Sequence, residues 1–255
     1  MIAALAALFY FDNQLDKLDL TSTPWQSLFA GRSQLPRGLL MLVAFNTLII
    51  FAAGELCDIF RAKGIAADRL MVTLAGLAGC IMMYAIPQSV TSRTTMAVFA
   101  SIVIVLFIAT LLKYSWVHHR TEGAVAVAAV TMLSLIYMGL LPGFLVTIRR
   151  WHSAWVVLAI LLITKSCDIG AYFTGRAIGR HKLIAWLSPG KTWEGLAGGI
   201  LFSASVAALL AWANNHLHIS GSWLLEEGQL LFKPDNFHIA RSAAAGALLG
   251  AVGQF

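Results

Sequence analysis

Long apolar segments, separated by short polar breaks, are the feature that most constrains how this chain can fold. A helix needs about 20 apolar residues to cross the hydrocarbon of a bilayer. Seven segments approach this length, at 38–56, 70–87, 96–112, 123–148, 153–173, 193–213 and 239–255. An eighth, 1–11, is shorter and lacks the basic start and cleavage site of a signal peptide. The segments predict an all-α, polytopic transmembrane bundle with about seven or eight spans.

The balance of charged and apolar residues indicates the same fold class. Of the 255 residues, 59% are hydrophobic and 12% are charged, whereas soluble domains carry about 25% charged residues. So few charges cannot cover a water-exposed globule, and lipid must therefore face much of the surface. No repeat or long linker interrupts the pattern. We predict one integral membrane domain over residues 1–255, with membrane lipids as its surroundings.

The formal net charge of +6 does not indicate nucleic-acid binding. The basic residues are spread between the apolar segments and form no basic run or aromatic-basic module. Basic residues of membrane proteins gather instead in cytoplasmic loops and beside anionic headgroups. The cysteines, Cys57, Cys80 and Cys167, are widely spaced and form neither a zinc-ligand pattern nor a disulfide framework.

One loop decides the predicted orientation. Lysines and arginines in alternate loops number nine against eight, which is a small overall bias. The 174–192 loop, however, carries four basic residues and no acid, while the 214–238 loop carries Glu226, Glu227 and Asp235. The positive-inside rule therefore predicts that 174–192 faces the cytoplasm and 214–238 faces outside.

Two opposite charges close the apolar segment that begins near Ser153. Lys165 and Asp168 are three residues apart, so on a helix they share a face, and steps of three and four add Tyr172 to it. Charges within a span normally face a partner or a water-filled cavity, because each costs about 2.5–3.5 kcal/mol at the helix centre. Two interpretations stay open at this point: a self-neutralising ion pair, or part of a functional site.

The polar stretch that follows favours a functional site. Glycines allow close backbone approach, and the loop's four cations, Arg176, Arg180, Lys182 and Lys191, suit a triphosphate. Asp168 suits Mg²⁺, which prefers one or two carboxylates together with phosphate oxygens. Pro189 excludes Ser188 from a helix, so the run 191–194 is expected to open the next helix, whose N-terminus attracts phosphate.

Two other features need separate interpretation. Gly190-Lys191-Thr192 ends like a P-loop, but Ala185 stands where the first glycine belongs, so a P-loop is excluded. Glu55 lies near the end of the second apolar segment, and an acid there is either functional or placed to reach the membrane surface. The two adjacent histidines, His118 and His119, are predicted to face solvent.

The residues from 168 to 199 resemble the phosphatidate cytidylyltransferase (CDP-diglyceride synthetase) family. The resemblance rests on fixed positions in order and spacing: Asp168, Gly170, Ala171, Tyr172, Phe173, Gly175, Arg176, Gly179, Lys182, Leu183, Ser188, Pro189, Lys191, Thr192, Trp193, Glu194, Gly195, Gly198 and Gly199. Weaker similarity extends upstream to Glu55, Gly64, Tyr137 and Gly139.

The resemblance implies a reaction and roles for these residues. CTP and phosphatidic acid would give CDP-diacylglycerol and pyrophosphate, with Mg²⁺ required in a two-metal site. Residues 165–199 would form the catalytic region at the cytoplasmic membrane edge of a bacterial inner membrane. The implied catalytic residues are Asp168, which also ligates the metal, Lys191 and Lys165. The implied substrate-binding residues are Arg176, Lys182, Ser188, Thr192, Glu194 and Tyr172, and Glu55 is a further possible site residue. A homodimer is compatible with the resemblance.

The chain departs from the family pattern in two places. Cys167 stands where a polar residue such as Asn is common. The family's C-terminal signature, rich in Lys, Asp and Gly and a source of further acids, would begin just after Phe255. Both ends look clipped, so residues 1–255 alone are expected to lack turnover. The alternatives are a truncated or inactive relative that assists assembly, and a small polytopic transporter.

Overall fold

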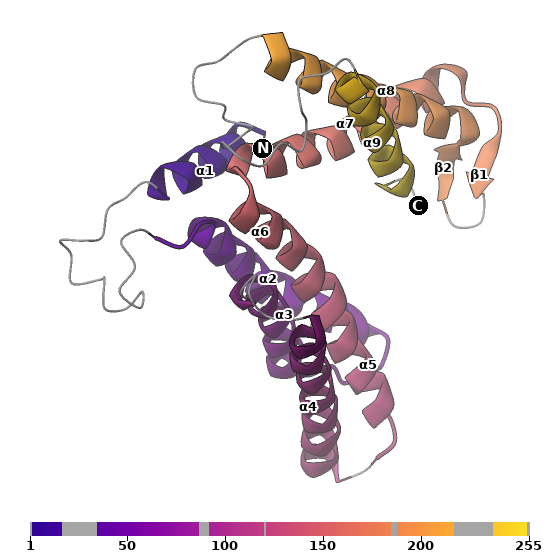
Figure 1. The fold of residues 1–255 in the computed structure, drawn as a ribbon. Coiled ribbons are helices and arrows are strands. Elements are labelled where there is room, and N and C mark those ends of the chain that lie inside the picture. The colour runs from indigo at the N-terminus through magenta and orange to yellow at the C-terminus, as the bar shows by residue number, and fades with distance from the viewer. Residues whose placement is uncertain are drawn as a thin grey trace. The chain divides into compact units, whose positions relative to one another are not determined.

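The structure is a computed structural model that describes residues 2–16, 35–86, 92–119, 121–184, 188–216 and 237–253. It divides into two compact units, Met1–Trp151 and His152–Phe255, and each is described by itself. The first unit holds α1 (Ile2–Leu15), α2 (Leu39–Ala62), α3 (Arg69–Ala85), α4 (Ser92–His118), α5 (Ala124–Ser134), η2 (Leu135–Leu140) and α6 (Leu141–Trp151) (Figure 1). The second holds α7 (Ala154–Ile178), β1 (Lys182–Ile184), β2 (Ser188–Thr192), α8 (Trp193–His216) and α9 (Phe237–Gly253).

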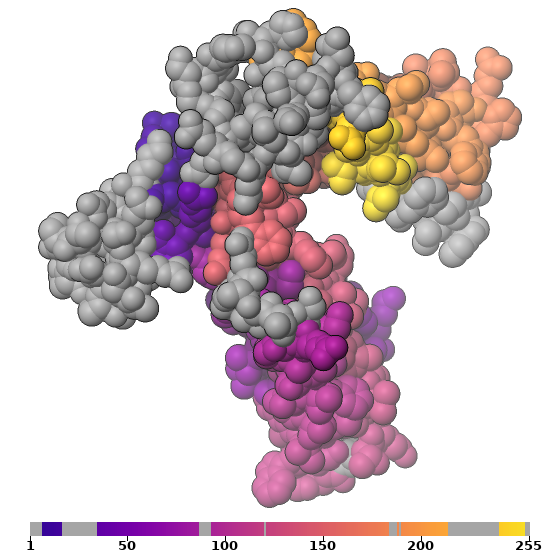
Figure 2. Space-filling view, viewed as in Figure 1, coloured from indigo at the N-terminus to yellow at the C-terminus, as the bar shows by residue number. Residues whose placement is uncertain are grey.

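All eight apolar segments of the sequence form helices, which confirms the predicted all-α polytopic membrane fold. Five described helices are long and apolar enough to cross a membrane: Leu39–Ala62, Arg93–His118, Ala124–Trp151, Ala154–Ile178 and Trp193–Ala213. Arg69–Ala85 and Ala240–Val252 are shorter apolar helices. Much of the α4 surface is open and carries large apolar side chains, as a lipid-facing helix should (Figure 2). The chain is an integral membrane protein.

Glycines bring α3 close to the long helix that α5, η2 and α6 form together. A Cβ on Gly139 would lie 2.7 Å from the carbonyl oxygen of Gly76, and one on Gly79 would lie 3.0 Å from the Cα of Gly139. Ser134 also donates a hydrogen bond of 2.7 Å to the carbonyl oxygen of Val72. Small residues at such a seam allow the van der Waals contact that drives helix association in lipid.

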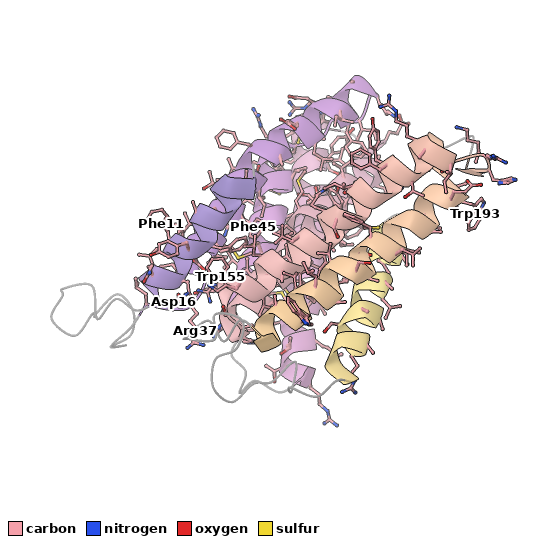
Figure 3. The ribbon with its side chains drawn as sticks, turned by 90° about the horizontal axis from the view of Figure 1, so that it is seen from above. Phe11, Asp16, Arg37, Phe45, Trp155 and Trp193 are labelled. Carbon is pink, nitrogen blue, oxygen red and sulfur yellow. The ribbon has the colours of Figure 1, made fainter. Side chains whose placement is uncertain are left out.

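A buried ion cluster joins α1 to the other helices of the first unit. Arg149 of α6 is 1% exposed and donates hydrogen bonds to the carboxylates of Asp12 and Asp16. Asp12 also accepts a hydrogen bond from the backbone N–H of Met41 in α2. Asp16 lies at the end of α1 (Figure 3). Arg149 therefore fixes the short helix α1 in place.

In the second unit, glycines let α7 and α8 pack with their backbones in contact. A Cβ on Gly198 would lie 2.1 Å from the Thr174 hydroxyl oxygen, and one on Gly199 would lie 2.9 Å from the carbonyl oxygen of Cys167. Helix α9 completes this unit, where Ser203 of α8 donates a hydrogen bond of 2.9 Å to the Gly246 carbonyl oxygen. The glycines of the polar motif thus position the two helices that carry it.

Candidate functional site

One exposed face of α7 carries the first predicted site residues. The Lys165 ammonium lies 3.0 Å from the Asp168 carboxylate, with 64% and 49% of these side chains exposed. One turn further on, Arg176 donates a hydrogen bond of 2.9 Å to the Tyr172 hydroxyl. The shared helical face predicted from the three- and four-residue spacing is confirmed. Within a membrane, charged side chains on such a face are stable only beside a partner of opposite charge, in a water-filled cavity or at the polar interface.

The chain between α7 and α8 forms a β-hairpin that the sequence analysis did not predict. Strands β1 and β2 pair antiparallel, with Lys182 opposite Thr192 and Ile184 opposite Ser188. The pairing continues into a hydrogen bond of 3.0 Å from the Trp193 N–H to the His181 carbonyl oxygen. The prediction that the whole 191–194 run opens the next helix was therefore wrong for Lys191 and Thr192, which end β2, and α8 begins at Trp193.

Thr192 joins the hairpin to the first turn of α8. Its side chain is buried, and its hydroxyl accepts a hydrogen bond of 3.1 Å from the N–H of Gly195, which caps the helix. A Cβ on Gly175, Gly179 or Gly195 would lie 3.1, 2.7 or 2.9 Å from this hydroxyl oxygen. These three glycines leave the space in which the hairpin base lies against the end of α7.

Glu194 holds the segment that links α7 to β1. Its carboxylate accepts backbone hydrogen bonds from Arg180 at 3.1 Å and from His181 at 3.2 Å. The His181 ring donates a third hydrogen bond, of 2.6 Å, through Nδ1. The substrate-binding role that the resemblance implies for Glu194 stays a prediction. In this structure its carboxylate positions the loop that precedes Lys182.

The cations predicted to bind phosphate lie close along the chain around this hairpin. Arg176 is in the last turn of α7, Arg180 follows the helix, Lys182 is in β1 and Lys191 is in β2, and all four are exposed. Gly190 beside Lys191 has open space around it, since a Cβ there would meet nothing within 4 Å. A hairpin that carries several basic residues attracts anions such as polyphosphates.

Few carboxylates are available near these cations. Among the described residues of the second unit, the acids are Asp168 and Glu194, and Glu194 is engaged by the linking segment. No group of three or more His, Cys, Asp or Glu residues gathers into a metal cage in the described part of the chain. Asp168 fits Mg²⁺ as one ligand, because this ion usually takes one or two carboxylates and completes its shell with phosphate oxygens and water.

The predicted site residues that remain to be placed are Ser188, Lys165 and Glu55. Ser188 starts β2 and pairs with Ile184, and Lys165 is paired with Asp168. Glu55 is exposed on α2 of the first unit, and its possible site role stays a prediction. The hairpin itself could have been found from the short apolar run Leu183-Ile184 followed by Pro189-Gly190, but three-residue strands give only a weak periodic signal.

Comparison with known proteins agrees with the motif. Residues 27–255 match the model of the cytidylyltransferase family. A phosphatidate cytidylyltransferase of Pseudomonas aeruginosa is 44% identical over 64 residues, 24% of this chain and 24% of that protein. The Bacillus subtilis protein of the same name is 30% identical over 177 residues, 64% of this chain and 61% of that protein. One from Staphylococcus epidermidis is 29% identical over 188 residues, 73% of this chain and 67% of that protein.

These matches also show how much of each relative the chain covers. The alignments span 24% of the Pseudomonas protein and 61% of the Bacillus protein, less than two thirds of either. No solved structure matches this chain.

Proposed function

We propose that this chain, which belongs to the cytidylyltransferase family, acts as a phosphatidate cytidylyltransferase in phospholipid synthesis. CTP and phosphatidic acid would be its substrates, and CDP-diacylglycerol and pyrophosphate its products. The relatives named above, which are phosphatidate cytidylyltransferases, support this reaction. The structural observation that carries the proposal is the exposed α7 face with Asp168, followed directly by a glycine-framed hairpin with Lys182 and Lys191.

The chemistry needs mainly charge neutralisation and alignment. A phosphate oxygen of phosphatidic acid forms a bond to the α-phosphorus of CTP, and the bond from that phosphorus to the bridging β-phosphate oxygen breaks. Pyrophosphate leaves with the electron pair of the broken bond. Positioning and electrostatic stabilisation supply most of the rate enhancement in such phosphoryl-type transfers. A cationic hairpin beside a carboxylate can supply both.

Each site residue then has a proposed task. Lys191 and Lys182 bind the triphosphate, and Arg176, oriented by the Tyr172 hydroxyl, assists them. Asp168, oriented by Lys165, would hold Mg²⁺, which supplies positive charge against the phosphate oxygens when it is bound. Three further residues act at the hairpin, namely Ser188, Thr192 and Glu194. Thr192 fixes the base of the hairpin, and Glu194 fixes the segment that leads into it.

We place the protein in a bacterial inner membrane with the hairpin facing the cytoplasm. The four basic residues of the 174–192 loop support this orientation through the positive-inside rule. At that edge the site meets water-borne CTP from one side and a lipid phosphate from the other. The opposite loop of the predicted topology, 214–238, lies outside the described residues apart from 214–216 and 237–238.

Cysteine labelling tests this orientation. Gly190→Cys puts a thiol in the open space at the hairpin, and Arg93→Cys puts one at the start of α4, on the other side of the membrane in the predicted topology. The three native cysteines, all buried, are replaced by alanine. In sealed right-side-out vesicles, an impermeant maleimide should label position 93, and should label position 190 only after permeabilisation. The reverse pattern would overturn the orientation.

Substitution of Lys191 tests the CTP-binding role in the full-length protein. Lys191→Ala removes a charge-assisted contact to phosphate, so the KM for CTP should rise about tenfold or more. The kcat should fall as well if the contact strengthens in the transition state. Lys191→Arg keeps the charge and should retain a KM for CTP nearer that of the unaltered protein. An unchanged KM in Lys191→Ala would contradict the proposal that this lysine binds CTP.

A further inference from the structure

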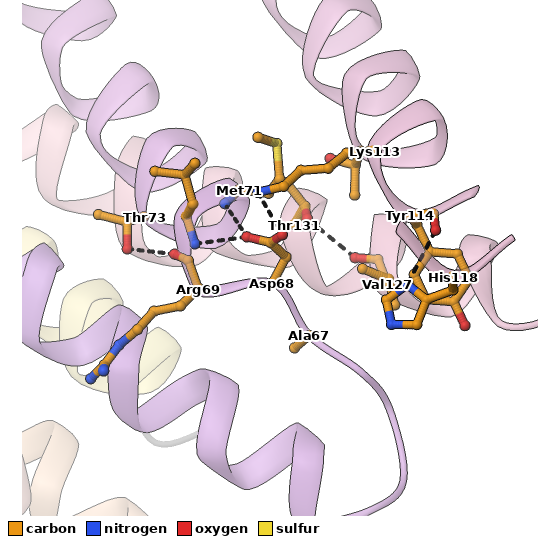
Figure 4. Close-up of polar contacts among 12 residues, drawn as sticks. Ala67, Asp68, Arg69, Met71, Thr73, Lys113, Tyr114, His118, Val127 and Thr131 are labelled. Atoms are coloured by element: carbon orange, nitrogen blue, oxygen red, sulfur yellow. Dashed lines mark hydrogen bonds and ion pairs between the residues drawn. The ribbon is translucent and has the colours of Figure 1, made fainter. Parts of the chain in front are cut away.

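A charged cavity lies within the first unit, where α2 ends, α3 begins and α4 ends. Its volume is about 350 Å³. The charged and aromatic side chains of its lining come from Arg61, Asp68, Arg69, Lys113, Tyr114 and His118, and all of these except Arg61 are labelled in Figure 4. None of these residues takes part in the transfer reaction proposed above.

The one acid in this lining is already engaged. One oxygen of Asp68 accepts hydrogen bonds of 2.9 and 3.1 Å from the backbone N–H groups of Leu70 and Met71, and so caps α3. Its other oxygen lies 2.6 Å from the Lys113 ammonium of α4. Burial raises the pKa of Asp68, but the hydrogen bond and positive charge of Lys113 and the hydrogen bonds from the two amides together lower it by more. Asp68 is therefore charged, and Lys113 balances it.

Two arginines supply positive charge that this pair does not balance. The Arg61 Nε donates a hydrogen bond of 3.0 Å to the Ala67 carbonyl oxygen, which fixes the guanidinium at the cavity. Its Nη1 lies 3.8 Å from the Asp58 carboxylate, with both side chains well exposed, and solvent screens such a pair strongly. Arg69 extends away from Asp68 (Figure 4) and lies over α2, where a Cβ on Gly54 would be 2.0 Å from its Nη2.

The rest of the cavity lining has an aromatic part and an apolar part. The His118 ring stacks on Tyr114 with 4.3 Å between ring centroids, and the Tyr114 hydroxyl donates a hydrogen bond of 2.8 Å to the Glu122 carbonyl oxygen. Leu70 and Val117, which also line the cavity, are 55% and 59% exposed. A ligand here would meet fixed cations and hydrocarbon side by side, at the ends of helices long or apolar enough to lie in lipid.

We propose that this cavity binds the phosphate-bearing headgroup of an anionic membrane lipid. Arg61 would contact the phosphate through the guanidinium edge that Ala67 does not use, and the lipid chain would lie against Leu70 and Val117. A soluble phosphate compound shares the headgroup chemistry, but its binding would make no use of the apolar side chains that stand beside the cations, Leu70 and Val117. The lipid is therefore the source that both halves of the lining fit.

Lipid binding to the detergent-solubilised full-length protein tests the proposal. Phosphatidylglycerol is the probe because it is anionic and is not a substrate of the proposed reaction, and zwitterionic phosphatidylcholine is the reference lipid. Native mass spectrometry should show tighter binding of phosphatidylglycerol. Arg61→Gln should weaken that binding about tenfold, since a charge-assisted hydrogen bond is lost. Arg61→Lys, which keeps the charge, should weaken it less.

Lys63→Gln is the matched control, because it removes the same charge from an exposed residue of the same turn that does not line the cavity. It should leave phosphatidylglycerol binding unchanged. Equal losses in both variants, or none in Arg61→Gln, would overturn the proposal. Full displacement of the lipid by millimolar pyrophosphate would overturn the lipid assignment in favour of a soluble phosphate.

Two further variants keep the outcome interpretable. If Arg61→Gln does not fold, Arg69→Gln takes its place, because it removes the other arginine charge of the lining; the expected loss of lipid affinity is smaller, since the Arg69 guanidinium lies over α2. Lys191→Ala should bind phosphatidylglycerol as the unaltered protein does, so a failure of the transfer activity and a failure of this lipid site give different results.

Discussion

Replacing Asp168 with asparagine should lower the turnover of the full-length protein by about a hundredfold or more while the protein stays folded. The change keeps the shape of the side chain but removes the negative charge that a magnesium ion requires. The Lys165–Asp168 pair is half exposed, and exposed ion pairs contribute little to stability. Turnover measured beside thermal unfolding in detergent therefore separates loss of chemistry from loss of fold.

Asp58→Asn serves as the control for this substitution. Asp58 is also an exposed helix residue that pairs with a cation three residues away, but it belongs to the first unit and has no proposed role in transfer. Its turnover should remain near that of the unaltered protein. Near-normal kinetics in Asp168→Asn would refute the metal-binding role and favour the interpretation of Lys165 and Asp168 as a self-neutralising pair.

A single methyl group on Gly179 should also abolish most of the activity. Its Cβ would lie 2.2 Å from the carbonyl oxygen of Gly175 and 2.7 Å from the Thr192 hydroxyl oxygen. Backbone atoms cannot yield as the end of a flexible side chain can, so Gly179→Ala must displace the segment that leads into β1. We expect kcat/KM for CTP to fall at least about tenfold, because small misplacements of aligning groups have large costs.

The hairpin provides its own control for this prediction. Gly190 lies beside Lys191, and a Cβ there would meet nothing within 4 Å. Gly190→Ala makes the same chemical change and should leave kcat/KM nearly unaltered. If both variants behave alike, the position of the hairpin base does not govern CTP use, and the role assigned to the glycines around Thr192 is wrong.

The helices could be predicted from sequence because lipid imposes a simple rule on them. Backbone groups in hydrocarbon must be paired within the segment, so long apolar runs become helices. The segments predicted at 38–56 and 153–173 match α2 and α7, although both helices continue into their polar ends. Helical spacing likewise predicted that Lys165 and Asp168 share one face, and in the structure they form an ion pair.

Contacts between distant residues could not be predicted by such local rules. The hairpin depends on pairing between Lys182 and Thr192, and the engagement of Glu194 depends on the backbone at Arg180 and His181. Likewise, Arg149 meets Asp12 across 137 positions of sequence. A single sequence gives no signal for these pairings, because neither apolar periodicity nor spacing specifies which distant polar groups will meet.

The most direct measurement is the conversion of radiolabelled CTP and phosphatidic acid to CDP-diacylglycerol by the purified full-length protein in mixed micelles. Magnesium should be required, and one pyrophosphate should appear for each CDP-diacylglycerol formed. Asp168→Asn and Lys191→Ala should each reduce the rate, whereas Asp58→Asn should not. Folded protein that forms no CDP-diacylglycerol with Mg²⁺ and both substrates present, or forms it equally well without Asp168, would contradict the proposed function.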